Sequence, residues 1–162
     1  MEKVILSLGS NIGNRRNTLF SAIEKINSRI GNIYRKSSIY ETEPWGFDNE
    51  NLFLNMAISV ESELSPRKIL NIIHEIEYLH GRKRSSANTY QARTLDIDII
   101  FYGESFYYEK DLIIPHAEAH NRKFVLIPIL EIEPEFKHPI LKQSLKDLLN
   151  KCTDDTEIYI NK

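Results

Sequence analysis

The sequence of 162 residues predicts an α+β fold with a ferredoxin-like βαββαβ core, in which an antiparallel sheet carries two helices on one face. Three observations support this prediction. Two segments have apolar residues at helical spacing, four have the short or alternating apolar pattern of strands, and these six follow one another in the order strand, helix, strand, strand, helix, strand. We expect a C-terminal hairpin and short helices as an addition to this core, and residues 1–162 as one domain.

The first half of the core shows a strand, a helix and a second strand. The apolar run 4–8 ends at Gly9 and predicts a buried strand that enters a turn. Between positions 19 and 30, isoleucines and a leucine spaced by four, three and four residues form one side of a helix, which Gly31 ends. Residues 33–40 are rich in β-branched and aromatic side chains and favour a strand.

The second half of the core repeats this order with clearer signals. Residues 53–61 alternate in polarity, which is typical of a strand with one face toward a core. Ser65 and Pro66 begin a helix as N-cap and first helical residue, and Gly81 ends it. Residues 95–102 form the last strand. One set of its side chains is expected to face the helices: Leu95, Ile97, Ile99 and Phe101. The other set faces away: Asp96, Asp98, Ile100 and Tyr102.

The remaining segments predict loops and short elements. Residues 42–52 contain proline, glycine, aspartate and asparagine and form a loop long enough to indicate a functional segment. Residues 106–108 and 112–114 predict a hairpin, 121–131 a short helix and 144–150 one or two final helical turns.

The composition is that of a globular cytoplasmic protein. Hydrophobic residues at 41 % and charged residues at 27 % exclude a disordered chain, and a formal net charge of −2 gives no overall attraction to nucleic acid or an anionic membrane. Cys152 is the only cysteine, which excludes an internal disulfide framework and thiolate zinc sites. No apolar run approaches the length of a membrane span, and the N-terminus lacks a secretory signal, so we expect a cytoplasmic location.

Asp96 and Asp98 give the sharpest chemical signal. Two residues apart on a strand, they project from the same face, with side chains roughly 6.5–7 Å apart. Carboxylate pairs suit hard cations, and Mg²⁺ usually completes its ligand shell with water and substrate phosphate. The pair therefore predicts a metal site, with the solvated outer face of an edge strand as the alternative.

A basic segment precedes these aspartates. Four basic residues and no acidic one lie between Tyr78 and Leu95: Arg82, Lys83, Arg84 and Arg93. Arginine holds phosphate oxygens in a bidentate fork, and carboxylate-bound Mg²⁺ beside several arginines is the combination that phosphoryl transfer requires. A solvated basic loop is the alternative. Because the sequence has no glycine-rich phosphate loop, we expect side chains to hold any nucleotide.

Other candidates share the face of the aspartates or follow the hairpin. Asn55 alternates with core positions and so shares that face with Phe53. An amide beside an aromatic ring suits the binding of a flat heterocycle. The alternative is an ordinary surface asparagine. Arg122 and Phe124 again combine a phosphate donor with a ring. His116, directly after a proline, is either structural or catalytic.

Eight motifs occur together in a fixed order along nearly the whole chain, from residue 9 to about residue 133. They are Gly9-Ser10-Asn11, Tyr40-Glu41-Thr42-x-Pro44-x-Gly46, Phe53-Leu54-Asn55, Glu77, Gly81-Arg82-x-Arg84, Arg93-Thr94-Leu95-Asp96-Ile97-Asp98-Ile99, Pro115-His116 and Asn121-Arg122-x-Phe124. In this order they resemble the 6-hydroxymethyl-7,8-dihydropterin pyrophosphokinase family of folate biosynthesis, which has a ferredoxin-like core.

The resemblance implies transfer of the terminal pyrophosphate of ATP to the hydroxymethyl oxygen of a reduced pterin, with release of AMP. It implies that Asp96 and Asp98 bind two Mg²⁺ ions and that Arg82 and Arg93 neutralise charge on the phosphates. The implied nucleotide contacts are Glu77, Arg84, His116 and Arg122. The implied pterin contacts are Thr42, Pro44, Trp45, Phe53, Asn55, Tyr90 and Phe124. We expect a monomer whose partners are these two substrates, with neither nucleic acid nor membrane.

Several positions depart from the family pattern. Residues 89–92 read Thr-Tyr-Gln-Ala where the family usually has Arg-Trp-Gly-Pro, so that Tyr90 supplies the aromatic group. His74 replaces a common glutamine, Phe53 a common tyrosine, and Trp45 a smaller aliphatic residue. No metal ligand or phosphate-binding arginine is lost, so we expect activity.

Two other classes of function compete with an enzyme. Ferredoxin-like sheets also stack RNA bases, but such sheets expose aromatic and basic side chains, whereas two aspartates would repel phosphate. A regulatory domain that binds a small molecule without catalysis is the other alternative, and only an assay separates it from an enzyme.

Overall fold

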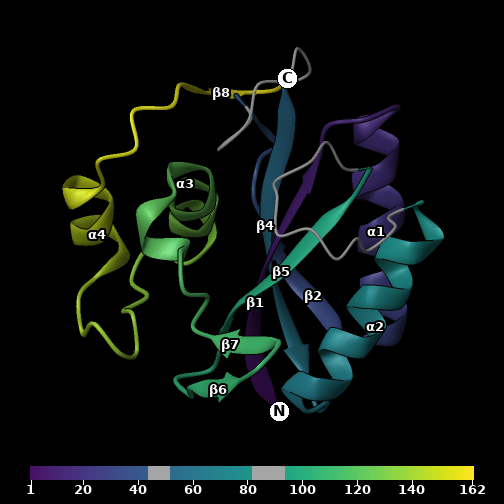
Figure 1. Ribbon diagram of the computed structural model, residues 1–162, viewed down its shortest axis with the longest axis horizontal. Helices are drawn as coiled ribbons and strands as arrows, with labels where there is room; N and C mark the ends of the chain where they lie inside the picture. Colours follow the sequence, from purple (N-terminus) through teal and green to yellow (C-terminus); the bar gives the residue numbers. More distant parts are fainter. Residues whose placement is uncertain (44–51, 82–93) are drawn as a thin grey trace.

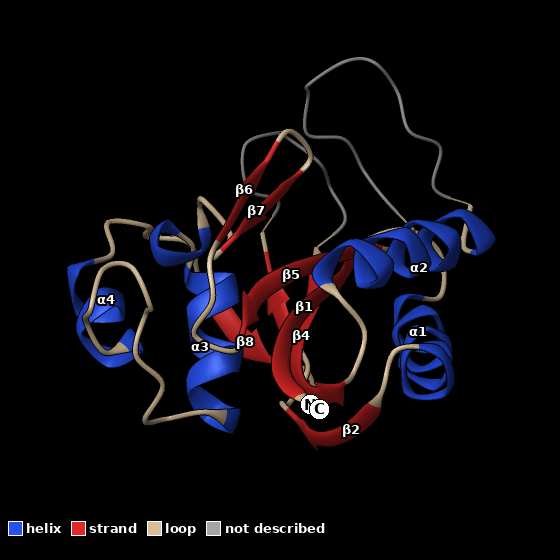
Figure 2. Cartoon of the chain, turned by 90° about the horizontal axis from the view of Figure 1, so that it is seen from below, coloured by secondary structure: helices blue, strands red, loops and turns tan. Residues whose placement is uncertain are grey.

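An antiparallel sheet lies between two helical layers (Figures 1 and 2). The computed structural model describes residues 1–43, 52–81 and 94–162. The strands are β1 (Glu2–Ser10), β2 (Asn32–Lys36), β3 (Tyr40–Thr42), β4 (Phe53–Ser62), β5 (Asp96–Tyr102), β6 (Tyr107–Glu109), β7 (Leu112–Ile114) and β8 (Ile158–Ile160). The helices are α1 (Arg15–Arg29), α2 (Pro66–Leu79), α3 (Lys123–Ile132) and α4 (Leu145–Lys151), with a 3₁₀ turn at Ala119–Asn121.

The predicted βαββαβ order is confirmed, and the strands lie in the order β5-β1-β4-β3-β8, with β2 also paired to β4. The expected strand over 33–40 is two strands, because the chain leaves the ladder at Ser37. The backbone N–H of Ser37 donates to the carbonyl of Ala57 at 2.9 Å, and its side-chain oxygen accepts from the N–H of Ala57 at 2.9 Å. In the segment that joins β2 to β3, a side chain thus replaces one backbone bond to β4.

Helices α1 and α2 cover one face of the sheet, as expected (Figure 2). Both begin at polar caps: Asn14 accepts from the N–H of Asn17 at 3.2 Å, and Ser65 accepts from the N–H of Lys68 at 3.3 Å. Gly31 follows α1 where the chain passes very close to β4. A Cβ there would lie 2.0 Å from the carbonyl oxygen of Glu61, so the crossing requires glycine.

The C-terminal region is more than an addition to the core. Helices α3 and α4 build a second apolar cluster on the opposite face of the sheet (Figure 1). Its buried members from the sheet are Ile5, Ala57, Ile100 and Phe101, and its buried members from the helices are Val125, Leu126, Ile129, Ile132, Leu145 and Leu148. Both faces of the central strands are therefore buried against helices over part of their length.

The expected alternation of the last strand is wrong at its end. Phe101 packs in the second cluster and Tyr102 in the first, the reverse of the expectation. The register explains this exchange, because Ile5 pairs with Phe101 while Leu6 pairs with Ile99. Ile100 is thus an extra residue, a β-bulge that shifts the alternation by one position. Asp96 and Asp98 precede the bulge and keep the expected face.

Three further observations complete the fold. Strand β8, which was not expected, pairs antiparallel with β3 and joins the chain's end to the sheet. The hairpin and the first short helix were expected, and they correspond to β6–β7 and α3. No helix among the described residues is long and apolar enough to cross a membrane.

Candidate active site

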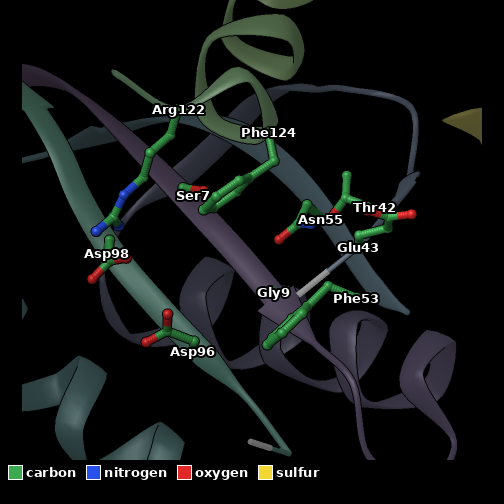
Figure 3. Close-up of a pocket in the computed structure, with 10 residues that line it drawn as sticks. All are labelled: Ser7, Gly9, Thr42, Glu43, Phe53, Asn55, Asp96, Asp98, Arg122 and Phe124. Atoms are coloured by element: carbon green, nitrogen blue, oxygen red, sulfur yellow. Dashed lines mark hydrogen bonds between the residues drawn. The ribbon is translucent and has the colours of Figure 1, made fainter. Parts of the chain in front are cut away.

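A pocket with about 470 Å³ of empty space, part of which is open solvent, lies on the face of the sheet opposite α1 and α2 (Figure 3). Ten residues line it: Ser7, Gly9, Thr42, Glu43, Phe53, Asn55, Asp96, Asp98, Arg122 and Phe124. Strands β1, β3, β4 and β5 supply the wall formed by the sheet, and the chain around the start of α3 supplies the last two residues. The pocket thus unites residues that are more than 100 positions apart in the sequence.

Strand β1 forms the floor of the pocket because it lies between β4 and β5. Gly9 pairs with Asn55 on one side and with Asp96 on the other, so that these three residues form a row across the sheet. With neighbouring strands about 4.8 Å apart, Asn55 and Asp96 are separated by roughly 10 Å. Ser7 likewise pairs with Asp98. The small residues of β1 leave this space open between an amide and two carboxylates.

Gly9 is also required for the position of Asn55. A Cβ at position 9 would lie 2.8 Å from Oδ1 of Asn55, well inside ordinary contact. Any larger residue would therefore push the amide out of its place. Glycine at this position serves close approach of a side chain rather than an unusual backbone conformation.

The amide of Asn55 is held by Thr42. Both side chains are buried, and Nδ2 of Asn55 donates to Oγ1 of Thr42 at 2.6 Å. The hydrogen bond orients the amide so that its carbonyl oxygen remains on the side of Gly9. In Figure 3 the amide lies between the rings of Phe53 and Phe124. A flat molecule that enters here would meet a ring on each side and an amide at its edge.

Asp96 and Asp98 lie on the pocket face of β5, as expected, and both are half-buried. No group of three or more histidine, cysteine, aspartate or glutamate side chains with metal-binding geometry occurs in residues 1–43, 52–81 and 94–162. A metal at this pair would accordingly need further oxygen ligands from water or substrate. Mg²⁺ usually completes its coordination in this way.

Arg122 brings a positive charge to the same end of the pocket. Its side chain is buried and extends toward Asp98, and its guanidinium carbon lies 5.9 Å from the centre of the Phe124 ring (Figure 3). Contact with a ring restricts a guanidinium to few orientations, which favours a bidentate grip on an oxyanion.

His116 does not line the pocket, but it interacts electrostatically with charged residues of this site. Burial, reinforced by the Arg122 charge, lowers the pKa of His116 to about 4, while Asp96 and Glu118 act in the opposite direction. The ring is therefore neutral at neutral pH. Its Nδ1 accepts from the N–H of Glu118 at 3.2 Å, which leaves the proton on Nε2.

Glu77 does not line the pocket either. It is buried on α2 and accepts from the backbone N–H of Ile97 at 3.0 Å. Among the residues that the structure describes, β5 is the last strand on its side of the sheet, so Glu77 occupies a hydrogen-bonding position at that edge. Because Ile97 separates the two aspartates, this bond holds the strand segment that presents them.

The remaining expected residues fall outside the described part of the chain. They are Pro44, Trp45, Arg82, Arg84, Tyr90 and Arg93. Sequence reasoning did not select three lining residues, namely Ser7, Gly9 and Glu43. For two of them a signal exists, since Ser7 and Gly9 alternate with Leu6 and Leu8 and so share the face that is not apolar.

The chain is similar to known proteins in sequence and in structure. Residues 5–134 match the model of the family described as 7,8-dihydro-6-hydroxymethylpterin-pyrophosphokinase. The 2-amino-4-hydroxy-6-hydroxymethyldihydropteridine pyrophosphokinase of Porphyromonas gingivalis is 40 % identical over 144 residues, which cover 86 % of this chain and 95 % of the relative. The protein of the same name from Aquifex aeolicus is 37 % identical over 147 residues, covering 91 % and 90 %.

Solved structures support the fold. The wild-type HPPK-DHPS of Plasmodium falciparum superposes with a TM-score of 0.75 at 18 % identity, covering 93 % of this chain. This chain spans 44 % of that longer protein. The family model matches most of the chain, and the relatives from Porphyromonas gingivalis and Aquifex aeolicus have nearly the same length. The chain therefore belongs to the 7,8-dihydro-6-hydroxymethylpterin-pyrophosphokinase family and is a pyrophosphokinase.

Proposed function

We propose that this protein transfers the terminal pyrophosphate of ATP to the hydroxymethyl group of 6-hydroxymethyl-7,8-dihydropterin, a step of folate biosynthesis, in the pocket of Figure 3. The observation that carries this assignment is the row Asn55–Gly9–Asp96, which sets an amide and a carboxylate on the two sides of an open floor. The Asn55 end of the row suits a heterocycle, and the Asp96 end suits a cation that binds phosphates.

The pterin occupies the end of the pocket at Asn55. Phe53 and Phe124 stack on the two faces of its ring, and Asn55 reads its hydrogen-bonding edge. Thr42 supports this role because it occupies Nδ2 of Asn55 and so orients the amide. Pro44, Trp45 and Tyr90 complete the pterin contacts.

The triphosphate occupies the end at the aspartates. Asp96 and Asp98 are the ligands for Mg²⁺, two ions in our proposal, and their half-buried oxygen pair on one face fits a hard cation. Ions held by Asp96 and Asp98 would supply positive charge that offsets the negative charge of the phosphates. Arg122, His116 and Arg84 contact the nucleotide, and Arg82 and Arg93 neutralise charge on the phosphates.

The transfer is a displacement at the β-phosphorus of ATP. A bond forms between this phosphorus and the hydroxymethyl oxygen, while its bond to the oxygen bridging the α- and β-phosphorus breaks and that oxygen leaves with AMP. The hydroxyl proton passes to solvent. The chain contributes by holding the ring at Asn55 so that its hydroxymethyl end points along the row toward Asp96. Glu77 contributes through β5, whose backbone it holds at Ile97.

The test is an assay of the purified chain with ATP, the reduced pterin and Mg²⁺, in which chromatography follows AMP and pterin diphosphate. We expect equal amounts of both products, none after chelation of the metal, and a loss of at least about a hundredfold in D96N and D98N. D147N is the matched control, since Asp147 is exposed on α4. Absence of AMP from the wild-type reaction, or normal turnover in D96N, would overturn the proposal.

A further inference from the structure

Arg15 connects the two strand ends that border the pocket. Its Nη1 donates to the backbone carbonyl of Leu52 at 2.6 Å and lies 3.4 Å from Oε1 of Glu41. Leu52 directly precedes Phe53 on β4, and Glu41 directly precedes Thr42 on β3. Thr42 and Phe53 are paired across the two strands, and both line the pocket. One guanidinium therefore binds the neighbours of both lining residues.

A second set of contacts ties the end of the chain to the same place. Arg16 donates to the backbone carbonyl of Asn161 at 3.0 Å and also contacts its side-chain oxygen. Asn161 donates from Nδ2 to Oε2 of Glu41 at 3.4 Å, and its backbone N–H donates to the carbonyl of Ile39 at 2.8 Å. Glu41 thus lies between Arg15 and Asn161, and β3 is held from both sides.

The position of Arg15 follows from the path of the chain. Strand β1 ends at Ser10, just after Gly9 on the pocket floor, and α1 begins at Arg15. The first turn of α1 therefore lies beside the strand ends of β3 and β4. The side chains of Arg15 and Glu41 are 28 % and 27 % exposed, so water screens their interaction only in part. The positive charge of a guanidinium also strengthens the hydrogen bond that it donates to a carbonyl.

We propose that Arg15 is a positioning residue for the acceptor end of the site. It sets the distance between β3 and the start of β4, and thereby the placement of Thr42 and Phe53 against the ring of the reduced pterin. Arg15 does not line the pocket and acts only through these neighbours. The aspartates lie on β5, at the other side of the row, and do not depend on this contact. This inference rests on the proposed function for the identity of the bound ring.

The test compares steady-state constants for the two substrates in R15A and R15K. We expect R15A to raise KM for the reduced pterin by about tenfold, with KM for ATP changed by less than about twofold, because both contacts of Arg15, to Leu52 and Glu41, lie on the pterin side alone. R15K keeps the charge and one of the two contacts, so it should recover part of the pterin affinity. R29A is the control, since Arg29 lies in the same helix and pairs with Glu75 away from the pocket.

A second measurement does not depend on catalysis. Hydrogen exchange of peptides that contain Thr42 and Phe53 should be faster in R15A than in wild type and in R29A, while exchange in β5 stays unchanged. Unchanged exchange, or equal rises in KM for both substrates, would overturn the proposal. If wild-type protein forms no AMP, the proposed function fails and exchange alone decides the role of Arg15. Normal wild-type activity with an unchanged pterin KM in R15A instead refutes only the role of Arg15.

Discussion

Asn55 donates a hydrogen bond of 2.6 Å to Thr42, and both side chains are buried on adjacent strands beside the pocket. The bond gives the amide a defined orientation that an isolated asparagine would lack. It also links the two residues energetically, since loss of the acceptor leaves a buried N–H group without its partner.

Substitution T42V keeps the shape of the side chain and removes the acceptor. We expect a loss of about 1–3 kcal/mol in unfolding free energy and a weaker affinity for the reduced pterin, because the amide then turns to find another partner. Chemical denaturation and calorimetry measure the two effects. T42S retains the hydroxyl and is the control; equal behaviour of both variants would contradict the role given to this bond.

Substitution G9A tests the close approach between β1 and Asn55. The added Cβ would lie 2.8 Å from the side-chain oxygen of Asn55, so the amide must move. Because a side chain yields more easily than a backbone, we expect a raised KM for the pterin with a small change in melting temperature. G31A provides the contrast, since its Cβ meets the backbone of Glu61 and should chiefly lower stability. A G9A variant with an unaltered pterin KM would refute this account of the floor.

Substitution E77A tests the support of β5 by α2. The N–H of Ile97 loses its acceptor while both aspartates remain, so we expect a higher Mg²⁺ concentration for half-maximal activity, by about three- to tenfold. E77Q keeps an acceptor oxygen and should lie closer to wild type. A titration of activity with Mg²⁺ measures this. If E77A and wild type share one titration curve, Glu77 does not position the aspartates.

The lowered pKa of His116 predicts a dependence of stability on pH. Because its pKa is about 4 in the folded protein and about 6.5 in an unfolded chain, the unfolded state binds the proton first as the pH falls. The stability that neutral His116 contributes is present above pH 6.5 and is lost between pH 6.5 and pH 4.

Chemical denaturation of wild type and H116Q at pH 7 and pH 5 tests whether the unfolding free energy falls with pH in this direction. We expect the wild type to lose about 2 kcal/mol more than H116Q over this interval, since only the wild type carries this titrating group. Other titrating groups, including His138, remain in both proteins and cancel in the difference. An equal loss in the two proteins would show that His116 has an ordinary pKa.

Most of the core could be predicted because its signals are local. A helix or strand repeats its apolar residues every few positions, and caps such as Ser65 lie next to the helix that they begin. The shared face of Asp96 and Asp98 follows from the pleat of a single strand, without knowledge of any partner strand. The family motifs are likewise contained in short runs of sequence, so the expectation of a pyrophosphokinase needed no coordinates.

Other features depend on which strands become neighbours. The bulge at Ile100 exists only against β1, and it exchanged the faces of Phe101 and Tyr102. Strand β8 is three residues long and is stabilised by β3, so its own sequence carries little signal. Glu43 lines the pocket through its place beside β3, although its residue type predicts only an exposed side chain.

The order of the elements, the acidic pair and the family motifs can all be read from the amino-acid sequence alone. Folding places Gly9 between Asn55 and Asp96, lets Thr42 orient the amide, and brings Phe124 on α3 to the same pocket. The two sets of features differ in the range of the interactions that produce them. Periodicity and capping act over a few residues, whereas register and side-chain contacts arise only when distant segments pack together.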